Sequence, residues 1–262
     1  MSAALISELD DGILTLTLNR PEKRNSLSEE MISALHAAID AAGADPDCHA
    51  VIIAAKGHVF SAGHDLKEMT AARENDDRGR AYYQDIMGRC AAMMQAIIHC
   101  PKPVIARVDG VATAAGCQLV ASCDLAVAST RARFCTPGVH IGLFCSTPMV
   151  ALSRNVGRKH ALEMLLLGEM IGAKKAARMG LVNRVAKPKK TAKKARKLAA
   201  IIAAKSKATI KTGKTAFYRQ IDMNLEDAYD YASAVMVDNM LAHDAEEGIG
   251  AFMQKRKPVW QD

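Results

Sequence analysis

The segment Arg107–Asp124, with the sequence RVDGVATAAGCQLVASCD, constrains the fold of this chain more than any other. An apolar run typical of a buried strand, residues 104–108, ends at the turn pair Asp109-Gly110. A stretch of small residues, 112–116, follows and passes into a helix-like segment that starts at Cys117. This order predicts a strand-to-helix junction at which another group can approach the backbone closely.

Two interpretations of this junction remain open. The first N–H groups of a helix have no acceptor within it, and they point outward at the positive end of the helix dipole. Such a junction can hold an anion, or a carbonyl oxygen that gains charge during a reaction. It can equally be a tight packing corner between a helix and a sheet, and this segment alone favours the packing corner.

Alternating strand and helix patterns over the first two thirds of the chain predict an α/β fold. Strands are expected at 5–9, 13–18, 50–54, 104–108, 125–128 and 182–185; helices are expected after the capping pair Ser26 and Glu29, over 82–98, and almost throughout from Pro148 onward. Residues 56–68 are expected to form a polar loop. We expect a core over residues 1–200 and a packed helical region over 201–262.

Several patterns exclude other classes of protein. No run of about 18 apolar residues is present, so no membrane span is expected. The N-terminus lacks a secretory signal pattern, which predicts a cytoplasmic protein, or one of the mitochondrial matrix if the chain is a processed eukaryotic protein. The seven cysteines form no CxxC pair and lie among apolar residues, so we expect reduced, buried thiols and no metal site.

The net charge of +7 comes from one segment. Between Lys187 and Arg219 there are twelve Lys or Arg residues and no Asp or Glu. This basic segment is either a solvated helix face or a surface for phosphates or RNA. Because it lacks the interleaved aromatic residues of single-strand RNA surfaces, we favour the solvated face and do not expect a nucleic-acid partner.

A second loop of small residues, FSAGHDLKE at 60–68, follows the strand at 50–54. If it lies beside residues 112–116, it can supply a second N–H to the same oxygen; losing one such donor costs about 3 kcal/mol of transition-state stabilisation. His64 and His140 are each a possible base or, more simply, a structural side chain. Cys145 is a nucleophile or a buried thiol, and Asp65 and Asp124 are expected to be caps or ion-pair partners.

The motifs, taken in order, resemble the crotonase (enoyl-CoA hydratase/isomerase) superfamily over nearly the whole chain. They are Asn19-Arg20-Pro21, Asn25-Ser26-Leu27, 60–66, 109–124, 168–173 with Gly180-Leu181-Val182, and 252–257. The resemblance implies a spiral of ββα units, with residues 201–262 as a trimerisation region, and a homotrimer or a dimer of trimers. It also implies an acyl-CoA thioester of fatty-acid metabolism as the substrate, with no cofactor other than its own coenzyme A.

The resemblance assigns roles to individual positions. The main-chain N–H groups of His64 and Ala115 match the pair that holds the thioester oxygen. The positions matching coenzyme A contacts are Ala62 beside the adenine, Lys67 near the phosphates together with Lys23 or Arg24, and Phe252 and Lys255, which match residues that reach the coenzyme A of a neighbouring subunit.

The sequence departs from the hydratases where the chemistry occurs. Their two catalytic glutamates are replaced by Gln118 and by Gly138, and the aspartate of some isomerases is replaced by Ser146. An amide can orient water but cannot titrate near neutrality, and glycine offers no side chain. We therefore expect weak or no hydration of enoyl-CoA.

Three functions stay open. The first is a crotonase-type lyase or isomerase that uses an unusual base or acts on a substrate that needs none. The candidate groups are then His64, His140, Cys145 and Ser146, with Gln118 as an amide that can orient water. The second is a catalytically silent acyl-CoA binder. The third is an RNA-binding protein that uses the basic segment 187–219.

Overall fold

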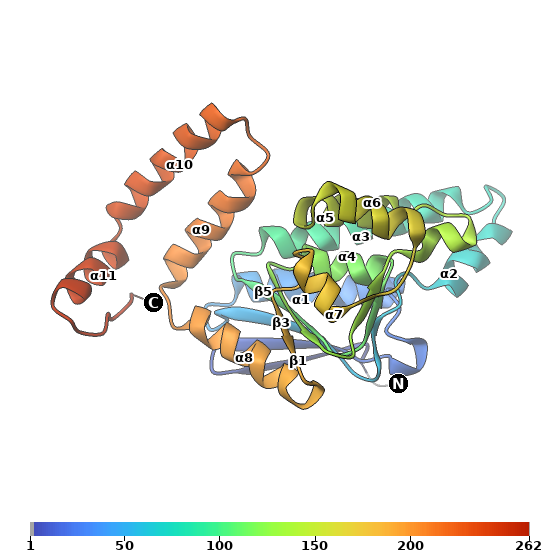
Figure 1. Ribbon diagram of the computed structural model, residues 1–262, viewed down its shortest axis with the longest axis horizontal. Helices are drawn as coiled ribbons and strands as arrows, with labels where there is room; N and C mark the ends of the chain where they lie inside the picture. The colour runs from blue at the N-terminus through green and yellow to red at the C-terminus, as the bar shows by residue number, and fades with distance from the viewer. Residues whose placement is uncertain (1–2, 262) are drawn as a thin grey trace.

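The computed structural model describes residues 3–261 and contains two β-sheets with helices packed around them (Figure 1). The first sheet has the strand order β1-β2-β3-β5-β7-β10 and the second the order β4-β6-β8-β9. The bounds of the first sheet are β1 Leu5–Asp10, β2 Ile13–Leu18, β3 Ala50–Ala55, β5 Val104–Val108, β7 Leu125–Ser129 and β10 Arg184–Ala186. Those of the second are β4 Val59–Ser61, β6 Val111–Thr113, β8 Arg133–Cys135 and β9 Ile171–Gly172. The predicted α/β class is confirmed.

Strands β1 and β2 form the antiparallel hairpin that the sequence predicts. Asp11 and Gly12 in the turn both have positive φ, 48° and 70°, as tight hairpin turns require. Strands β2, β3, β5, β7 and β10 then pair in parallel, and β4, β6 and β8 do the same in the second sheet. After the β1–β2 hairpin, the pairs β3 and β4, β5 and β6, and β7 and β8 each place their first strand in the first sheet and their second strand in the second sheet before a helix follows.

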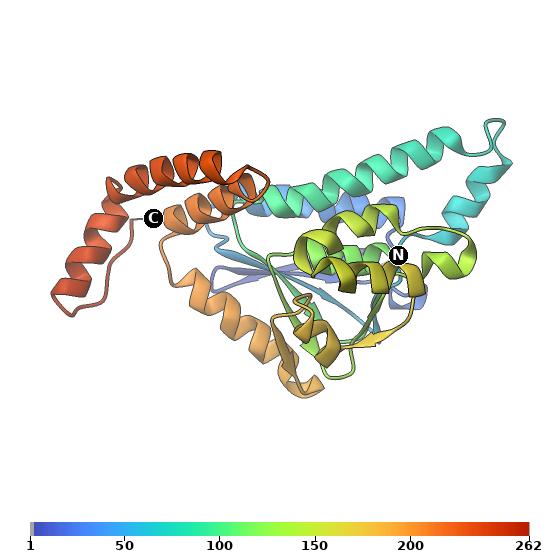
Figure 2. The same cartoon turned by 45° about the horizontal axis from the view of Figure 1, so that its top comes forward.

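The helices of the first two thirds cover the sheets and carry the expected apolar faces. Their bounds are α1 Glu29–Ala44, α2 Leu66–Ala71, α3 Arg80–His99, α4 Ala115–Ser122, α5 Ser146–Asn155, α6 Arg158–Leu167 and α7 Ala173–Arg178. Ser28 caps α1 by accepting a hydrogen bond from the N–H of Met31. Figure 2 shows α3 above the first sheet and α8, Pro188–Ala203, below it. On that lower face, Ala195 and Ala199 of α8 pack against Ile52, Ile105 and Val127.

Four short strands differ from the sequence-based expectation. The predicted loop 56–68 contains β4 and the start of α2, and strands β6, β8 and β9 were not predicted. Helix α4 begins at Ala115 rather than Cys117, α5 at Ser146 rather than Pro148, and the strand expected at 182–185 lies at 184–186. A strand of two or three residues is too short to display the alternation by which strands are recognised in a sequence.

The C-terminal helices are α9 Lys207–Gln220, α10 Leu225–Met240 and α11 His243–Met253, and they extend away from the sheets (Figure 1). Lys214 anchors α9, because its Nζ lies 2.7 Å from the Asp124 carboxylate and also donates to the carbonyls of Ile97 and Lys102. The hydroxyl of Tyr218 donates to the same carboxylate at 2.8 Å. The prediction that Asp124 is a cap or ion-pair partner is confirmed.

The C-terminal tail returns to the start of α9. The indole Nε1 of Trp260 donates to the carbonyl of Ala204 at 3.1 Å, and the N–H of Gln261 donates to Asp244. Glu247 accepts two hydrogen bonds from the Arg256 guanidinium and a third from the N–H of Val259. The tail therefore links α11 to the α8–α9 junction.

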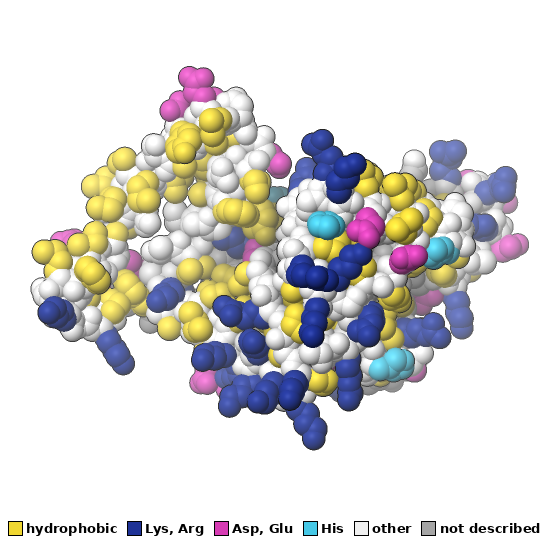
Figure 3. Space-filling view, in the orientation of Figure 1, with side chains coloured by type: hydrophobic (Ala, Val, Ile, Leu, Met, Phe, Trp, Pro, Cys, Tyr) yellow, Lys and Arg dark blue, Asp and Glu magenta, His cyan; other side chains and the backbone are white. Residues whose placement is uncertain are grey.

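Large apolar side chains of α9, α10 and α11 remain exposed on the single chain and gather on these helices in Figure 3. They include Phe217, Tyr229, Met236, Val237, Leu241, Phe252 and Met253. The seven cysteines, by contrast, are all buried, as predicted, and all are free thiols. Burial raises the pKa of Cys48 and Cys135 to about 11 and that of Cys90 to about 12.

Candidate functional site

The two small-residue loops of the sequence lie in direct contact. The Thr113 hydroxyl donates to the carbonyl of Ala62 at 3.0 Å. A Cβ added to Gly63 would lie 3.2 Å from the main-chain nitrogen of Ala115, and one added to Gly116 would lie 2.3 Å from the Ser61 carbonyl oxygen. Only glycine permits this second approach, because a side chain at 116 would overlap the backbone at the end of β4.

The entry into α4 has a strained backbone. Ala114 has φ 49° and ψ −121°, a conformation that alanine rarely adopts, and its N–H donates to the Cys135 carbonyl at 3.0 Å. Ala115 is the first residue of α4, so its N–H has no acceptor within the helix. The strain turns the chain sharply into α4, next to the loop that carries Gly63 and His64.

His64 lies on that loop, where it forms an isolated parallel bridge with Leu27. The N–H of Leu27 donates to the Gly63 carbonyl at 2.8 Å, which fixes the loop against the residues before α1. The Nε2 atom of His64 is buried and has no hydrogen-bond partner within residues 3–261. Burial lowers the pKa of His64, so its imidazole is neutral at pH 7.

Gln118 lies one helical turn after Ala115 and is only 5% exposed. Its N–H donates to the Ala114 carbonyl at 3.0 Å. Its Oε1 is buried, and no group in the described part of the chain donates to it. His64 on the loop and Gln118 in α4 thus each have a buried side-chain atom that can form a hydrogen bond but has no partner in the described part of the chain.

Gly138 lies in the 3-10 helix η3, Pro137–Ile141, where no side chain fits. A Cβ at this position would lie 2.8 Å from the Leu143 carbonyl oxygen and 2.9 Å from the Cys145 sulfur. The Cys145 thiol is itself buried, and burial raises its pKa. The local backbone therefore leaves no room for a carboxylate at 138.

The other two catalytic candidates lie in different surroundings. His140 packs against the C-terminal end of α6, since a Cβ added to Gly168 would lie 2.8 Å from its Nε2. Ser146 is exposed at the first residue of α5, and its hydroxyl donates to the Phe144 carbonyl at 3.3 Å. No hydrogen bond within residues 3–261 joins either residue to His64 or Gln118.

The positions expected to contact coenzyme A fall into two groups. Ala62 donates its N–H to the carbonyl of Arg24 at 3.1 Å, so Lys23 and Arg24, both exposed, flank the His64 loop. Lys67 is exposed in the first turn of α2. Asp65 caps this helix, because its carboxylate accepts a hydrogen bond from the N–H of Lys67. The predicted capping role of Asp65 is confirmed.

Phe252, 84% exposed, and the exposed Lys255 form the second group, at the end of α11. In Figures 1 and 2 this end lies on the opposite side of the chain from α2. Within one chain they therefore do not approach the His64 loop.

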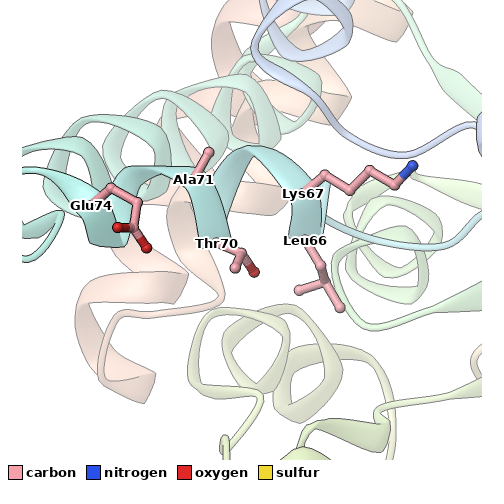
Figure 4. A pocket seen from close by; sticks show the side chains of 5 residues that line it. All are labelled: Leu66, Lys67, Thr70, Ala71 and Glu74. Atoms are coloured by element: carbon pink, nitrogen blue, oxygen red, sulfur yellow. The ribbon is translucent and has the colours of Figure 1, made fainter.

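An open groove of about 480 Å³ runs along α2 next to this loop. It is lined by Leu66, Lys67, Thr70, Ala71 and Glu74. Figure 4 shows Leu66, Thr70 and Glu74 on one side of the helix, while the Lys67 side chain extends from the beginning of the helix in another direction. The groove thus has an apolar end near the loop and a carboxylate at its far end.

The basic segment lies on and after α8. Thr191, Ala195 and Ala199 of α8 are buried, and Lys189, Lys190, Lys193, Lys194 and Lys197 are exposed. In Figure 3, dark-blue side chains gather at the lower edge, where Figure 1 shows α8. This helix therefore has one apolar face against the sheet and one basic face toward solvent.

Within residues 3–261, no helix is both long enough and apolar enough to span a bilayer. The described residues also contain no group of three or more His, Cys, Asp or Glu side chains that could hold a metal ion.

Comparison with known proteins gives consistent matches. The sequence model of the enoyl-CoA hydratase/isomerase family matches residues 8–262. Enoyl-CoA hydratase domain-containing protein 3, mitochondrial, of Xenopus laevis is 48% identical over 97% of this chain and 85% of its own length. A crystal structure of an enoyl-CoA hydratase from Mycobacterium smegmatis is 50% identical and superposes with a TM-score of 0.95 over 99% of both chains. Human enoyl-CoA hydratase domain-containing protein 3 is 46% identical, with a TM-score of 0.93 over 98% of this chain and 100% of its own.

Proposed function

Because this chain belongs to the enoyl-CoA hydratase/isomerase family, we propose that it binds an acyl-CoA thioester through the main-chain N–H groups of His64 and Ala115. The observation that carries this proposal is the contact between the two loops. They lie so close that a Cβ added to Gly63 would be 3.2 Å from the main-chain nitrogen of Ala115. An N–H at the first turn of α4 and one on the facing loop can converge on a single oxygen. This arrangement stabilises negative charge on that oxygen.

We propose further that ordinary enoyl-CoA hydration is weak in this protein. Gln118 cannot deliver or accept a proton near neutrality, and the backbone around Gly138 excludes a carboxylate. Binding of the thioester needs only main-chain donors, whereas proton transfer needs carboxylates, and positions 118 and 138 carry none. The protein would then bind acyl-CoA without turnover, or catalyse a reaction that does not need acid or base groups at these two positions.

The positions around the loop suggest where coenzyme A lies. Lys67, with Lys23 and Arg24, is placed to attract the phosphates, and Ala62 is small enough to permit an adenine nearby. Phe252 and Lys255 can contribute only from another copy of the chain. We therefore propose a homotrimer or a dimer of trimers, in which the exposed apolar faces of α9, α10 and α11 are covered by neighbouring chains.

The location of the chain stays a prediction with two alternatives, cytoplasm and mitochondrial matrix. The Xenopus laevis relative is named as a mitochondrial protein, which supports the second.

Infrared spectroscopy of butyryl-CoA carrying ¹³C at the thioester carbonyl tests the binding proposal directly. Two N–H donors polarise the C=O bond, so its stretching frequency is expected to fall when the purified protein is added. Ala115→Phe, which fills the junction, should abolish the shift, whereas Ala192→Phe on the exposed face of α8 should leave it intact. An unshifted band with wild-type protein at saturating concentration would exclude the paired donors.

Crotonyl-CoA tests the second part of the proposal. We expect turnover far below about 10 per second, a typical enzyme value. Turnover at or above that rate would show that another acid or base replaces the missing glutamates.

A further inference from the structure

Helix α8 presents a single charged face to solvent. The residues of this lysine face are all exposed, and they are Lys189, Lys190, Lys193, Lys194 and Lys197. Because successive residues of a helix turn by about 100°, the five side chains lie within an arc of about 140°, and the face extends about 12 Å along the helix. The buried side chains of Thr191, Ala195 and Ala199 lie on the opposite side.

The charges of the lysine face contribute nothing to the fold. None of the ion pairs within residues 3–261 involves these five lysines. Arg196, in the same part of the helix, pairs instead with Asp10 and Asp11 of the β1–β2 turn, at 2.7 and 3.1 Å. Like charges four residues apart, such as Lys189 and Lys193, repel each other and destabilise a helix. A partner outside the chain accounts for charges that the fold itself does not use.

The shape and composition of this face do not suit a nucleic-acid strand. Proteins that bind single strands combine a basic groove with aromatic side chains on which bases stack. Helix α8 contains no aromatic residue, and the lysine face is the convex outer side of a helix. The crevice at its C-terminal end, beside His49, Lys102 and Ile202, has a volume of only about 10 Å³, which is room for about one water molecule.

The lysine face does not suit a protein partner either. The centre of a stable protein interface is formed by large apolar and aromatic side chains. Ile201, 52% exposed, is the only large apolar side chain of α8 that is exposed. Ala192 and Ala200 are the other exposed apolar residues of the helix, and they are small. A fluid lipid surface needs no apolar centre, because its anionic headgroups can move laterally to meet separate lysines.

We propose that the lysine face of α8 binds the surface of a bilayer that contains anionic phospholipids. Clusters of about four to eight basic residues on a helix are typical of proteins that bind such surfaces. The apolar side of α8 packs against Ile52, Ile105 and Val127, so the helix cannot turn it toward the acyl chains. The attachment is therefore electrostatic and reversible, and it does not depend on the thioester site.

Flotation of the full chain with lipid vesicles tests the proposal. The protein should float with vesicles of phosphatidylcholine mixed with phosphatidylserine, and it should stay behind with vesicles of phosphatidylcholine alone. The screening length falls from about 10 Å at about 0.1 M salt to about 3 Å at about 1 M, so sodium chloride at the higher concentration should release the protein. Binding that resists this salt, or equal binding to both kinds of vesicle, would overturn the proposal.

Two double variants of equal charge connect the binding to α8. Lys190→Gln with Lys194→Gln should weaken the affinity for the mixed vesicles about 25-fold, or about 5-fold for each lysine. Its melting temperature should be equal to that of the wild type or higher, because repulsion within the helix is removed. Lys159→Gln with Lys257→Gln, at exposed positions outside α8, should bind like the wild type; Figure 1 shows α6, which carries Lys159, on the opposite side of the chain from α8. Equal losses in the two variants would assign the binding to net charge and overturn the proposal.

Competition with soluble anions separates a lipid surface from other partners. Polyuridylic acid, added at the phosphate concentration that matches the accessible phosphatidylserine, should leave most of the protein on the vesicles. Displacement by this RNA would overturn the proposal in favour of a nucleic-acid surface. Inorganic phosphate should release no more protein than sodium chloride of the same ionic strength does. A greater release by phosphate would indicate a discrete phosphate site and would likewise overturn the proposal.

Discussion

At the scale of single residues, Gly138 decides which acid or base this site can contain. The Cβ of any other residue would lie 2.8 Å from the Leu143 carbonyl oxygen, so Gly138→Glu is expected to lower the free energy of unfolding by about 1–3 kcal/mol rather than to restore a catalytic carboxylate. Urea denaturation measures this loss. Gly88→Ala, inside α3 with open space around it, is the control and should stabilise the protein by about 0.5–1 kcal/mol. A stable Gly138→Glu variant with high hydratase activity would contradict the prediction.

The interpretation of Gln118 and Gly138 as departures from the hydratases comes from the sequence alone, because recognisable motifs flank both positions. It does not reveal that Ala114 has a positive φ or that His64 and Gln118 each have an unpaired buried atom. These properties arise where one loop meets another that is 51 residues away along the chain, as Ala62 and Thr113 are. The small residues of both loops indicate that another group packs closely against their backbone, but they do not identify that group.

At the scale of elements, prediction succeeded where a strand or helix is long enough to show its period. Strands β2 and β3 have six residues each and were located within one residue, whereas β4, β6 and β8 have three and were missed. Those short strands form the second sheet, which positions both loops of the site. The α/β class could thus be derived from hydrophobic periodicity. The arrangement of the site could not, because it depends on strands too short to show a period.

The attachment of α9 depends on one lysine. Lys214 has a side chain only 8% exposed and neutralises Asp124, whose side chain is 15% exposed. Lys214→Met removes the charge and leaves the carboxylate and two carbonyls short of a donor, so we expect a loss of about 3 kcal/mol in the free energy of unfolding. Lys211→Met, at an exposed position of the same helix, should change it by less than about 0.5 kcal/mol. Equal effects of the two changes in chemical denaturation would show that the ion pair does not anchor the helix.

The link between α11 and the C-terminal tail should respond to acid. Hydrogen bonds from Arg256 and Val259 lower the pKa of Glu247 to about 2, below the value of about 4.3 in an unfolded chain. Because the folded pKa is the lower one, this group stabilises the fold fully above pH 4.3 and loses that contribution as the pH falls toward 2. Fluorescence of Trp260, the single tryptophan, should report release of the tail over this interval.

Two variants check that assignment. Glu247→Gln should release the tail already at neutral pH and flatten the acid transition, whereas Glu226→Gln, in the first turn of α10, should leave it unchanged. A transition of the same size in Glu247→Gln would assign the acid response to another group.

At the scale of the whole molecule, the apolar surface of α9, α10 and α11 predicts self-association. Leu241 is 81% exposed in the single chain, and an exposed apolar surface of this kind commonly marks an interface. Sedimentation is expected to give three or six times the chain mass of 28.1 kDa. Leu241→Glu should shift the distribution toward single chains, while Gln95→Glu on α3 should not. A wild-type protein that sediments as a single chain at micromolar concentration would contradict the proposed assembly.

The contact between the two loops has a consequence for folding. The loop with Gly63 and the junction at Ala115 belong to different ββα units, so a chain that ends between them contains only one of the two N–H groups that we propose as donors to the thioester oxygen. The chain would then gain the ability to bind a thioester only when both units have folded and packed together. A thioester at 100 times its dissociation constant would shift the folding equilibrium toward the native state by about 2.7 kcal/mol. If the proposed binding holds, a bound thioester would thereby protect the protein from degradation.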